Sequence, residues 1–398
     1  MNMTKLSKIT KTLSTASVTV ILLAFIVTVG VLTVSKNRDT LFSPDPSTGD
    51  VKTRIVTAFD ENIVGFDRFL SVYSTAQHLL GTSVYDDAGY TYLIRDSENN
   101  LHFNTVHADA APYADAVAEL NNVLLTENIP FLYIQAPTKE IDGYTKYPLG
   151  IDYATVDNAA DMVKELTERG VNMIDLSEVF ANNGTDPATM FYRTDHHWTT
   201  ETAFDAFGYV VSYLNENYGL SLDMSLCERE NWLSESQPQS FLGSIGRRIG
   251  KEAAGLDDYT FLEPNFETSY YVYYPPISEI YPNWAGTFRD AFVREGVLYS
   301  EDVNANRYAS YFEFDYGHLI IENLLDDNEL HIAVVKDSFA LPFTAFLSTA
   351  AAKIDMIDLR EFEGSVTEYL VETSPDIVLM LYSGGSFSDV MYEFDKSK

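Results

Sequence analysis

A carboxylate, two imidazoles and an indole stand side by side in the segment Asp195-His196-His197-Trp198. A carboxylate and the imidazole that it orients are two of the three members of a nucleophilic triad. The imidazole serves as the base for the third member, a hydroxyl or a thiol. The spacing of Asp195 and His197 lets the carboxylate turn back onto the imidazole and hold its tautomer. The tetrad therefore predicts nucleophilic catalysis if the chain supplies a nucleophile elsewhere.

Ser338 is the nucleophile that the sequence offers. It follows the predicted strand 331–335 and lies next to the start of a predicted helix over 339–352. A side chain at this position projects from the carboxyl edge of a parallel sheet, where open α/β sheets bind their ligands. The first N–H groups of the helix can stabilise an oxyanion there. The alternative is that Ser338 only caps the helix, because serine is a favoured N-cap residue.

The tetrad at 195–198 also has two other interpretations. Asp195, His196 and His197 are residue types that bind zinc or iron, although the rings of adjacent histidines diverge. The other alternative is structural, with Asp195 as a helix N-cap and Trp198 in the core. The remaining histidines show no ligand spacing, so we predict no metal; they are His78, His102, His107, His318 and His331.

The elements that would position these residues alternate between helices and strands. Apolar periodicity predicts helices over 112–127, 156–169, 200–217, 339–352 and 365–373, and strands over 130–134, 171–176, 331–335, 353–359 and 376–381. This alternation indicates a parallel sheet with helices on both faces. Upstream, we predict a helix over 61–80 and a β-hairpin within 83–105. Residues 220–330 are rich in Tyr, Pro and Asn, and we expect an insertion with β-hairpins or a cap over the sheet.

Residues 14–35 form an uncharged apolar run that is long enough to span a bilayer. Three lysines precede this run and no acidic residue appears before Asp39, so the positive-inside rule places residues 1–13 in the cytoplasm. We expect residues 36–60 to be a polar linker and 61–398 an extracytoplasmic domain. The alternative to this single-pass anchor is a cleaved signal peptide.

The composition limits the partners of the chain. The 398 residues include 59 acidic and 26 basic ones, a formal net charge of −33, which would repel nucleic-acid phosphates. We therefore expect no nucleic-acid partner. Cys227 is the single cysteine, so an intramolecular disulfide is excluded, and we expect it to be a small buried apolar residue.

Several segments resemble the bacterial DHHW family, which is related to the SGNH-hydrolase-like proteins that O-acetylate alginate and other exopolysaccharides. The resemblance covers about residues 60–398. It rests on segments in the family's order, namely Ala136-Pro137-Thr138-Lys139, Tyr192–Thr199, Phe241-Leu242-Gly243-Ser244, Lys336-Asp337-Ser338-Phe339 and Ile357-Asp358-Leu359-Arg360. It implies an SGNH-like, flavodoxin-like α/β fold.

The same resemblance implies a triad of Ser338, His197 and Asp195, with an acetyl ester on Ser338 as the intermediate. Candidate contacts to the substrate or the oxyanion are Arg360, His196, Lys139, Trp198 and Ser244. Three positions depart from the family. Lys336 replaces the Gly of the G-D-S block, Leu341 stands where relatives often have Asn, and Ser383-Gly384-Gly385 follows the last strand in place of Asn.

We therefore predict a membrane-anchored, extracytoplasmic O-acetyltransferase or acetylesterase that uses no cofactor. Its partners would be a cell-surface polysaccharide and a membrane-bound acyltransferase that supplies acyl groups. Trp198, Trp284 and the Tyr-rich stretch 270–281 are candidates for stacking on sugar rings, with core packing as the alternative. The alternative functions are an inactive polysaccharide-binding or assembly subunit, which the departures favour, and a metal-dependent hydrolase.

Overall fold

The structure is a computed structural model that describes residues 3–43, 51–56, 63–87, 89, 91–275, 283–326 and 328–396. The chain divides into two compact units, Met1–Leu79 and Leu80–Lys398. The larger unit contains all three β-sheets of the described residues. We describe each unit separately.

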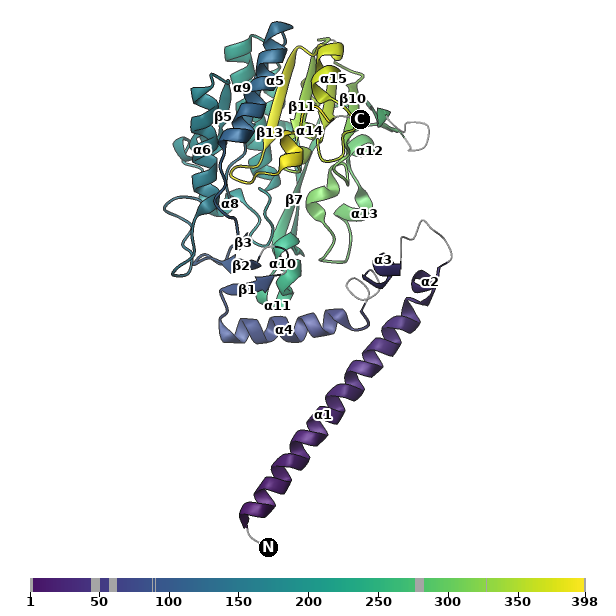
Figure 1. The fold of residues 1–398 in the computed structure, drawn as a ribbon. Helices are drawn as coiled ribbons and strands as arrows, with labels where there is room; N and C mark the ends of the chain where they lie inside the picture. The colour runs from purple at the N-terminus through teal and green to yellow at the C-terminus, as the bar shows by residue number, and fades with distance from the viewer. Residues whose placement is uncertain are drawn as a thin grey trace. The chain divides into compact units, whose positions relative to one another are not determined.

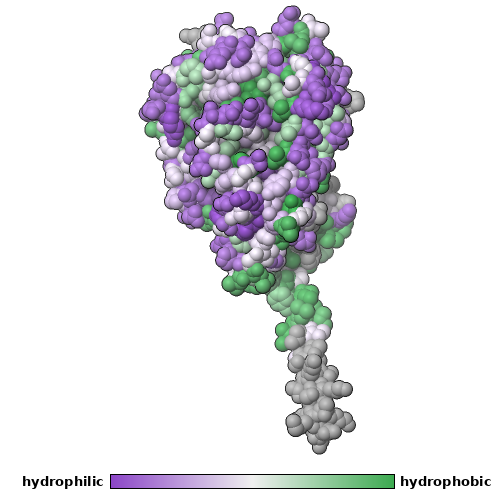
Figure 2. Space-filling view, turned by 90° about the vertical axis from the view of Figure 1, so that its left-hand side faces the viewer, coloured by the Kyte–Doolittle hydropathy of each residue, from purple (hydrophilic) through white to green (hydrophobic). Residues whose placement is uncertain are grey.

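The N-terminal unit contains the long helix α1 (Met3–Lys36), which includes the predicted apolar run. Among the described residues, the helical stretch Thr19–Lys36 is the one long and apolar enough to cross a membrane. Its apolar side chains, such as Val20, Ile21 and Val27, are exposed. Figure 2 shows hydrophobic side chains gathered on this helix, whereas the visible face of the larger unit is mostly hydrophilic.

The region predicted to be a linker is partly helical. Helices α2 (Arg38–Leu41) and α3 (Val51–Val56) lie within it, and Pro44, Pro46 and Gly49 lie outside the described residues. Helix α4 (Phe66–Leu80) begins later than the predicted start at 61, because the chain first makes a turn through Gly65, whose φ of 81° favours glycine. Residues 61 and 62 are outside the described part of the chain.

The main sheet has eight strands in the order β5-β4-β13-β11-β12-β10-β8-β9 (Figure 1). The first five are parallel, as predicted; they are β5 (Met173–Asp175), β4 (Phe131–Gln135), β13 (Ile377–Tyr382), β11 (His331–Lys336) and β12 (Lys353–Ile357). The last three are antiparallel to their neighbours; they are β10 (His318–Asn323), β8 (Tyr270–Tyr273) and β9 (Trp284–Gly286). The sheet is therefore mixed. The 220–330 segment adds strands at one edge, and these strands can be antiparallel because antiparallel pairing needs no crossover helix.

Helices cover both faces of the sheet (Figure 1), because parallel strands are apolar on both sides. Along β4, Leu132 and Ile134 join one core and Phe131 and Tyr133 join the other. The first core contains side chains of α7 (Leu176–Asn182), α9 (Thr200–Tyr218) and α14 (Ala340–Leu347). The second contains side chains of α5 (Ala111–Thr126), α6 (Ala154–Glu168) and α15 (Val366–Thr373). Helix α14 ends earlier than predicted, and the Ser348 and Thr349 hydroxyls donate to carbonyl oxygens of its last turn.

Two smaller sheets flank this core. The predicted hairpin is present as β2 (Thr91–Arg95) and β3 (Leu101–Phe103), with β1 (Val84–Asp87) as a third strand that we did not predict. A two-stranded ribbon pairs β6 (Trp232–Phe241) with β7 (Asp257–Pro264).

The remaining described helices are short. They are α8 (Pro187–Met190), α10 (Ser244–Ile249), α11 (Lys251–Ala254), α12 (Phe288–Phe292), α13 (Glu295–Leu298), and the 3-10 turns η3 (Met224–Cys227), η4 (Arg229–Asn231), η6 (Arg307–Ser310) and η7 (Asp389–Tyr392).

The Tyr-rich stretch 270–281 is only partly described, because residues 276–282 lie outside the described residues. Its first part forms β8, where Tyr270 and Val272 are buried and Tyr271 and Tyr273 are half-buried. Residues 220–330 thus provide edge strands, a ribbon and short helices, and they are integrated with the main core.

Candidate active site

The loop before α9 holds the tetrad in a narrow turn. An isolated β-bridge joins Phe191 to Trp198, and the N–H of Thr199 donates to the carbonyl oxygen of Met190 over 2.9 Å. The hydroxyl of Thr199 caps α9 by accepting a hydrogen bond from the Thr202 N–H. The alternative in which Asp195 caps the helix is therefore wrong, and the Asp195 carboxylate is available for other contacts.

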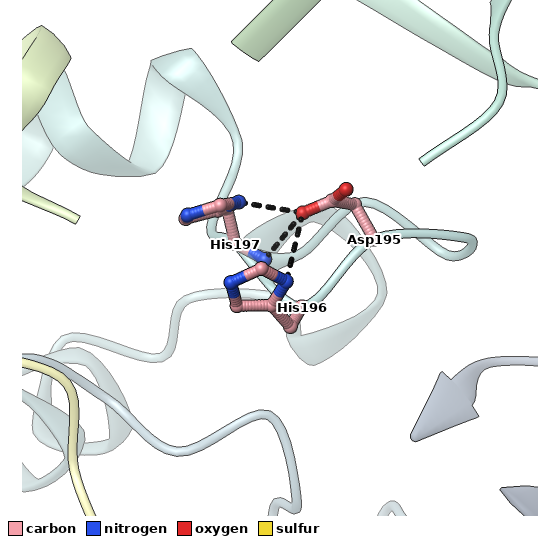
Figure 3. A group of neighbouring side chains, drawn as sticks. All are labelled: Asp195, His196 and His197. Carbon is pink, nitrogen blue, oxygen red and sulfur yellow. Dashed lines mark hydrogen bonds and ion pairs between the residues drawn. The ribbon is translucent and has the colours of Figure 1, made fainter. Parts of the chain in front are cut away.

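Asp195 binds His197 twice (Figure 3). Its Oδ1 lies 2.6 Å from the Nδ1 of the imidazole and also accepts the backbone N–H of His197 over 3.0 Å. Its Oδ2 accepts the backbone N–H of Ser244 over 2.5 Å. Burial alone would raise the pKa of Asp195, but the electrostatic interaction with the two neighbouring imidazoles, chiefly His197, and these hydrogen bonds hold that pKa well below its usual value. The carboxylate is therefore ionised and fixes one tautomer of His197.

The Ser338 hydroxyl lies at the other side of the same imidazole. Its Oγ is 2.7 Å from the Nε2 of His197. Ser338 does not cap α14, which begins at Ala340; instead Asp337 Oδ1 accepts the N–H of Phe339 over 2.9 Å. The carboxylate of Asp337 also accepts the N–H of Ser383 over 2.7 Å, which ties the end of β11 to the end of β13.

Tyr308, from the inserted segment, packs against this imidazole. Its ring stacks on the His197 ring with centroids 3.8 Å apart and an angle of 11°. Its hydroxyl donates to the Phe339 carbonyl oxygen over 2.9 Å and accepts the indole N–H of Trp198 over 3.1 Å. Sequence analysis did not identify Tyr308, since no local pattern distinguishes it from the other 25 tyrosines.

Three residues predicted to contact the substrate make contacts within the protein. The ammonium of Lys139 donates to the carbonyl oxygens of Leu101, Arg193 and Asp195, at 2.7, 3.1 and 2.5 Å, so all three of its protons are used. Trp198 is 0% exposed, because its indole N–H is bound inside the core, and it cannot stack on a sugar. Burial lowers the pKa of Lys139 to about 8.

Ser244 is the third of these residues, and Gly243 explains its position. A Cβ atom at Gly243 would lie 2.4 Å from the Cβ of Asp195, so only glycine allows this approach. The approach directs both polar groups of Ser244 into the site, with its N–H on Asp195 and its hydroxyl 2.8 Å from His196 Nδ1. Ser244 therefore contacts the acid and the neighbouring imidazole.

Ser338, His196 and Arg360 line a cavity of about 560 Å³. Arg360 is held there by Asp358, at 2.6 and 2.9 Å, and by Asp315 at 3.0 Å, and the bonds to Asp358 chiefly raise its pKa. Lys336, which replaces the family's glycine, is fully buried and binds the same two carboxylates. Its side chain therefore belongs to this cluster of ion pairs.

The arrangement favours a nucleophilic triad over a metal centre. Asp195, His196 and His197 do lie close enough to share an ion. However, the 2.6 Å separation of Asp195 and His197 is that of a hydrogen bond, and the second nitrogen of His197 faces Ser338. Cys227 is half-buried, and burial raises its pKa to about 12, which argues against a thiolate nucleophile.

Residues 96–250 match the family model described as SGNH hydrolase-like domain, acetyltransferase AlgX. This part of the chain is therefore similar to an SGNH hydrolase-like domain. The match confirms the predicted resemblance and supports the predicted class of acyl-transfer enzyme. No curated protein matches the chain.

Solved structures share the fold. The chain is similar to PatB1 from Bacillus cereus with a sulfonyl adduct, with a TM-score of 0.62, 21% identity, and coverage of 77% of this chain and 98% of that one. It is also similar to a DHHW family protein from Eubacterium siraeum, with a TM-score of 0.57, 15% identity, and coverage of 80% and 100%. These similarities confirm the predicted SGNH-like α/β fold of the larger unit.

Proposed function

We propose that the chain is a membrane-anchored, extracytoplasmic acyl-transfer enzyme that moves acetyl groups on a cell-surface polysaccharide. The observation that carries the proposal is the continuous hydrogen-bond chain from Asp195 through His197 to Ser338, with steps of 2.6 and 2.7 Å. These are the distances that an acid, a base and a nucleophile need for acyl transfer. The complete chain of contacts gives no support to the alternative of an inactive binding subunit.

The reaction would proceed in two steps. His197 Nε2 takes the proton of Ser338, whose Oγ attacks the acetyl carbonyl, and the same proton passes to the departing donor oxygen. An acetyl ester then remains on Ser338. In the second step a sugar hydroxyl gives its proton to His197 and attacks the ester, and the proton returns to Ser338 Oγ. The ionised Asp195 stabilises the imidazolium in both steps.

The backbone N–H of Ser338 is the first candidate for the oxyanion donor. In the described part of the chain this N–H makes no hydrogen bond, and it lies just before the N-terminus of α14. Arg360 is a second candidate, because its guanidinium lines the same cavity as Ser338. Neither donor is itself one of the residues in which the chain departs from its family.

The substrate and the location rest on two further observations. The matched family model describes an acetyltransferase, which favours an acetyl group on a sugar hydroxyl. Helix α1 supplies an apolar span that would anchor the chain, with residues 1–13 cytoplasmic and the larger unit outside. A membrane-bound acyltransferase would then deliver acetyl groups to Ser338 across the bilayer.

The test is hydrolysis of 4-nitrophenyl acetate by the full chain in detergent. Ser338→Ala should lower kcat/KM by roughly a thousandfold or more, because the nucleophile is lost. Ser234→Ala changes an exposed serine on β6 and is the matched control. A sulfonyl fluoride probe should label wild type and the control, but not Ser338→Ala.

Two results would count against the proposal. Wild-type activity no higher than that of Ser338→Ala, without labelling, would remove the mechanism. Activity that a chelator abolishes and Ser338→Ala retains would select the metal-dependent alternative. Adding a polysaccharide with free hydroxyls distinguishes acetyl transfer from hydrolysis. In a transferase, the sugar hydroxyls should compete with water for the acetyl group on Ser338.

A further inference from the structure

His196 takes no part in the triad, yet it lines the cavity of about 560 Å³ that also contains Ser338. Its side chain is 36% exposed, whereas those of Asp195 and His197 are 1% and 7% exposed. Of the two adjacent imidazoles, His196 therefore offers more surface to a bound substrate. Its two ring nitrogens have different surroundings, and these decide what the side chain can do.

The protein holds one nitrogen of the His196 ring. Nδ1 lies 2.8 Å from the hydroxyl oxygen of Ser244 and 3.4 Å from Oδ1 of Asp195. Because the Asp195 carboxylate is ionised, it favours a proton on the nitrogen that faces it, and this N–H donates to Ser244. Burial, together with His197, lowers the pKa of His196 to about 3, so the ring is neutral near neutral pH. A neutral imidazole with its proton on Nδ1 carries a lone pair on Nε2.

The second nitrogen of His196 is open to a ligand. Nε2 lies on the side of the ring away from Asp195 (Figure 3). Within the part of the chain that the structure describes, Nε2 makes no hydrogen bond, and it is not among the buried polar atoms that lack a partner. This atom is therefore reached from the cavity that His196 lines. Its lone pair accepts a hydrogen bond, so this nitrogen serves a donor group of the substrate and not an oxyanion.

Neighbouring rings fix the plane of His196 and with it the direction of the lone pair. The distances between ring centroids are 3.8 Å to His197, 5.5 Å to Phe103 and 6.3 Å to Phe339. Phe103 ends β3 and Phe339 follows Ser338, and both rings line the same cavity. An acceptor whose direction is fixed before binding loses little conformational entropy when a ligand arrives.

The place of His196 beside His197 matters for the second step of the proposed reaction. In that step a hydroxyl of the acceptor gives its proton to His197 and attacks the acetyl ester. With centroids 3.8 Å apart, the two imidazoles lie within the span of neighbouring hydroxyls on one sugar residue. The cavity volume admits such a residue. A site that hydrogen-bonds a substrate hydroxyl also rejects an analogue that lacks it.

We propose that His196 is the acceptor-binding residue of this site and that the acceptor is a sugar with two adjacent free hydroxyls. One hydroxyl donates to Nε2 of His196. The neighbouring hydroxyl gives its proton to His197 while its oxygen bonds to the acetyl carbon. The bond from that carbon to Ser338 Oγ then breaks, and Oγ takes the proton from His197. The inference rests on the proposed function, whose acceptor it describes.

The test compares two acceptors that differ in one hydroxyl, with the full chain in detergent and 4-nitrophenyl acetate as the donor. They are trans-1,2-cyclohexanediol and cyclohexanol, and cellohexaose is a sugar probe with adjacent hydroxyls. The measured quantity is acetylated acceptor, determined by mass spectrometry, per 4-nitrophenol released. This transfer ratio reports the choice of acceptor even when the total rate changes. We expect wild type to have a ratio for the diol that is about tenfold or more above that for cyclohexanol, and to acetylate cellohexaose.

Two substitutions separate the nitrogens of His196. His196→Asn keeps an amide near Nδ1 but has no atom at the place of Nε2, so the transfer ratio for the diol should fall about tenfold. His196→Gln is longer and brings an amide oxygen near the place of Nε2, so it should recover part of the ratio. His107→Asn makes the same change at an exposed histidine that pairs with Asp152, and it should keep the wild-type ratio. The comparison of the two acceptors in wild type needs no substitution, so it tests the proposal even if a variant does not fold.

Two results would overturn the role of His196. One is a wild type that acetylates the diol no more often than cyclohexanol. The other is a folded His196→Asn with the wild-type ratio, which is expected if His196 only packs or positions water. Either result, with 4-nitrophenol release that depends on Ser338, contradicts this inference alone. Release that Ser338→Ala leaves unchanged contradicts the proposed function and this inference together.

Discussion

Gly243 shows how closely single residues are packed around the acid of the site. A Cβ atom there would lie 2.4 Å from the Cβ of Asp195 and 2.6 Å from its backbone nitrogen. Neither neighbour can move without shifting the carboxylate that accepts from His197 and Ser244. The absence of a side chain at position 243 therefore allows the Asp195 carboxylate to occupy its position in the site.

Gly243→Ala should lower both stability and activity. Overpacking at this position should cost about 1–3 kcal/mol of unfolding free energy, and displacement of Asp195 should reduce kcat/KM for an acetyl ester by about tenfold or more. Denaturant unfolding and ester hydrolysis measure the two effects. Gly296→Ala is the control, because a Cβ there meets nothing within 4 Å. Equal effects of the two changes would contradict the packing argument.

His196 and His197 are adjacent but should respond differently to pH. Burial, together with the neighbouring His197, lowers the pKa of His196 to about 3, so this ring gains its proton only below that value and is neutral from about pH 4 upward. An acid limb in the rate of ester hydrolysis therefore belongs to another group. His196→Asn should keep the acid limb of kcat/KM at the same pH as wild type. Nitrogen NMR that showed His196 titrating near pH 6.5 would refute this assignment.

At the scale of elements, Lys139 joins three segments that are distant in sequence. It follows β4, and its ammonium binds carbonyl oxygens at the start of β3 and at two positions of the loop that carries Asp195. The clamp fixes that loop against the carboxyl edge of the sheet. Lys139 is thus a positioning residue that acts through Asp195.

Lys139→Met should lower kcat for an acetyl ester by about 10- to 100-fold and leave KM nearly unchanged, because the substrate contacts remain while the triad loses its alignment. Steady-state kinetics measures the two constants separately. Lys164→Met, on the exposed face of α6, is the matched control. A rise in KM with an unchanged kcat would instead indicate a direct substrate contact.

Sequence reasoning succeeded for elements with a strong apolar pattern. The five parallel strands are short apolar runs between helices, and each lies close to its predicted position. The same pattern placed Ser338 after β11, and the structure brings it next to His197. Hairpins were expected within 220–330, but the edge strands β8 to β10 were not placed, because the pairing of a Tyr-rich segment depends on a distant edge that no local period reveals.

The roles within the site were harder to predict than its members. Trp198 and Lys139 were expected at the substrate. Trp198 is buried in the core, whereas Lys139 lines the cavity but donates its protons to backbone carbonyl oxygens. Tyr308 reaches His197 from more than 100 residues away, so only the tertiary packing identifies it. The residue types predicted the chemistry of the site, whereas the contacts that each side chain makes depend on the three-dimensional fold.

At the scale of the whole molecule, the two units should be separable in function. Residues 80–398 contain the hydrogen-bonded Asp195, His197 and Ser338 and the large hydrophobic cores of both sheet faces, while the apolar span lies in α1. The full chain should sediment with membranes after cell lysis. A chain that begins at Leu80 should stay in the supernatant and retain Ser338-dependent ester hydrolysis. A folded but inactive short form, judged by circular dichroism, would show that the N-terminal unit contributes to the site.

The central position of β13 has a consequence for biosynthesis. This strand lies between β4 and β11, yet it is the last strand of the chain to be made. If the larger unit is exported in chain order, it crosses the membrane with a gap at the middle of its sheet and without the bond from the Ser383 N–H to Asp337. The nucleophile would gain its support only after translocation is nearly complete. Premature termination or clipping before β13 would then leave an inactive protein.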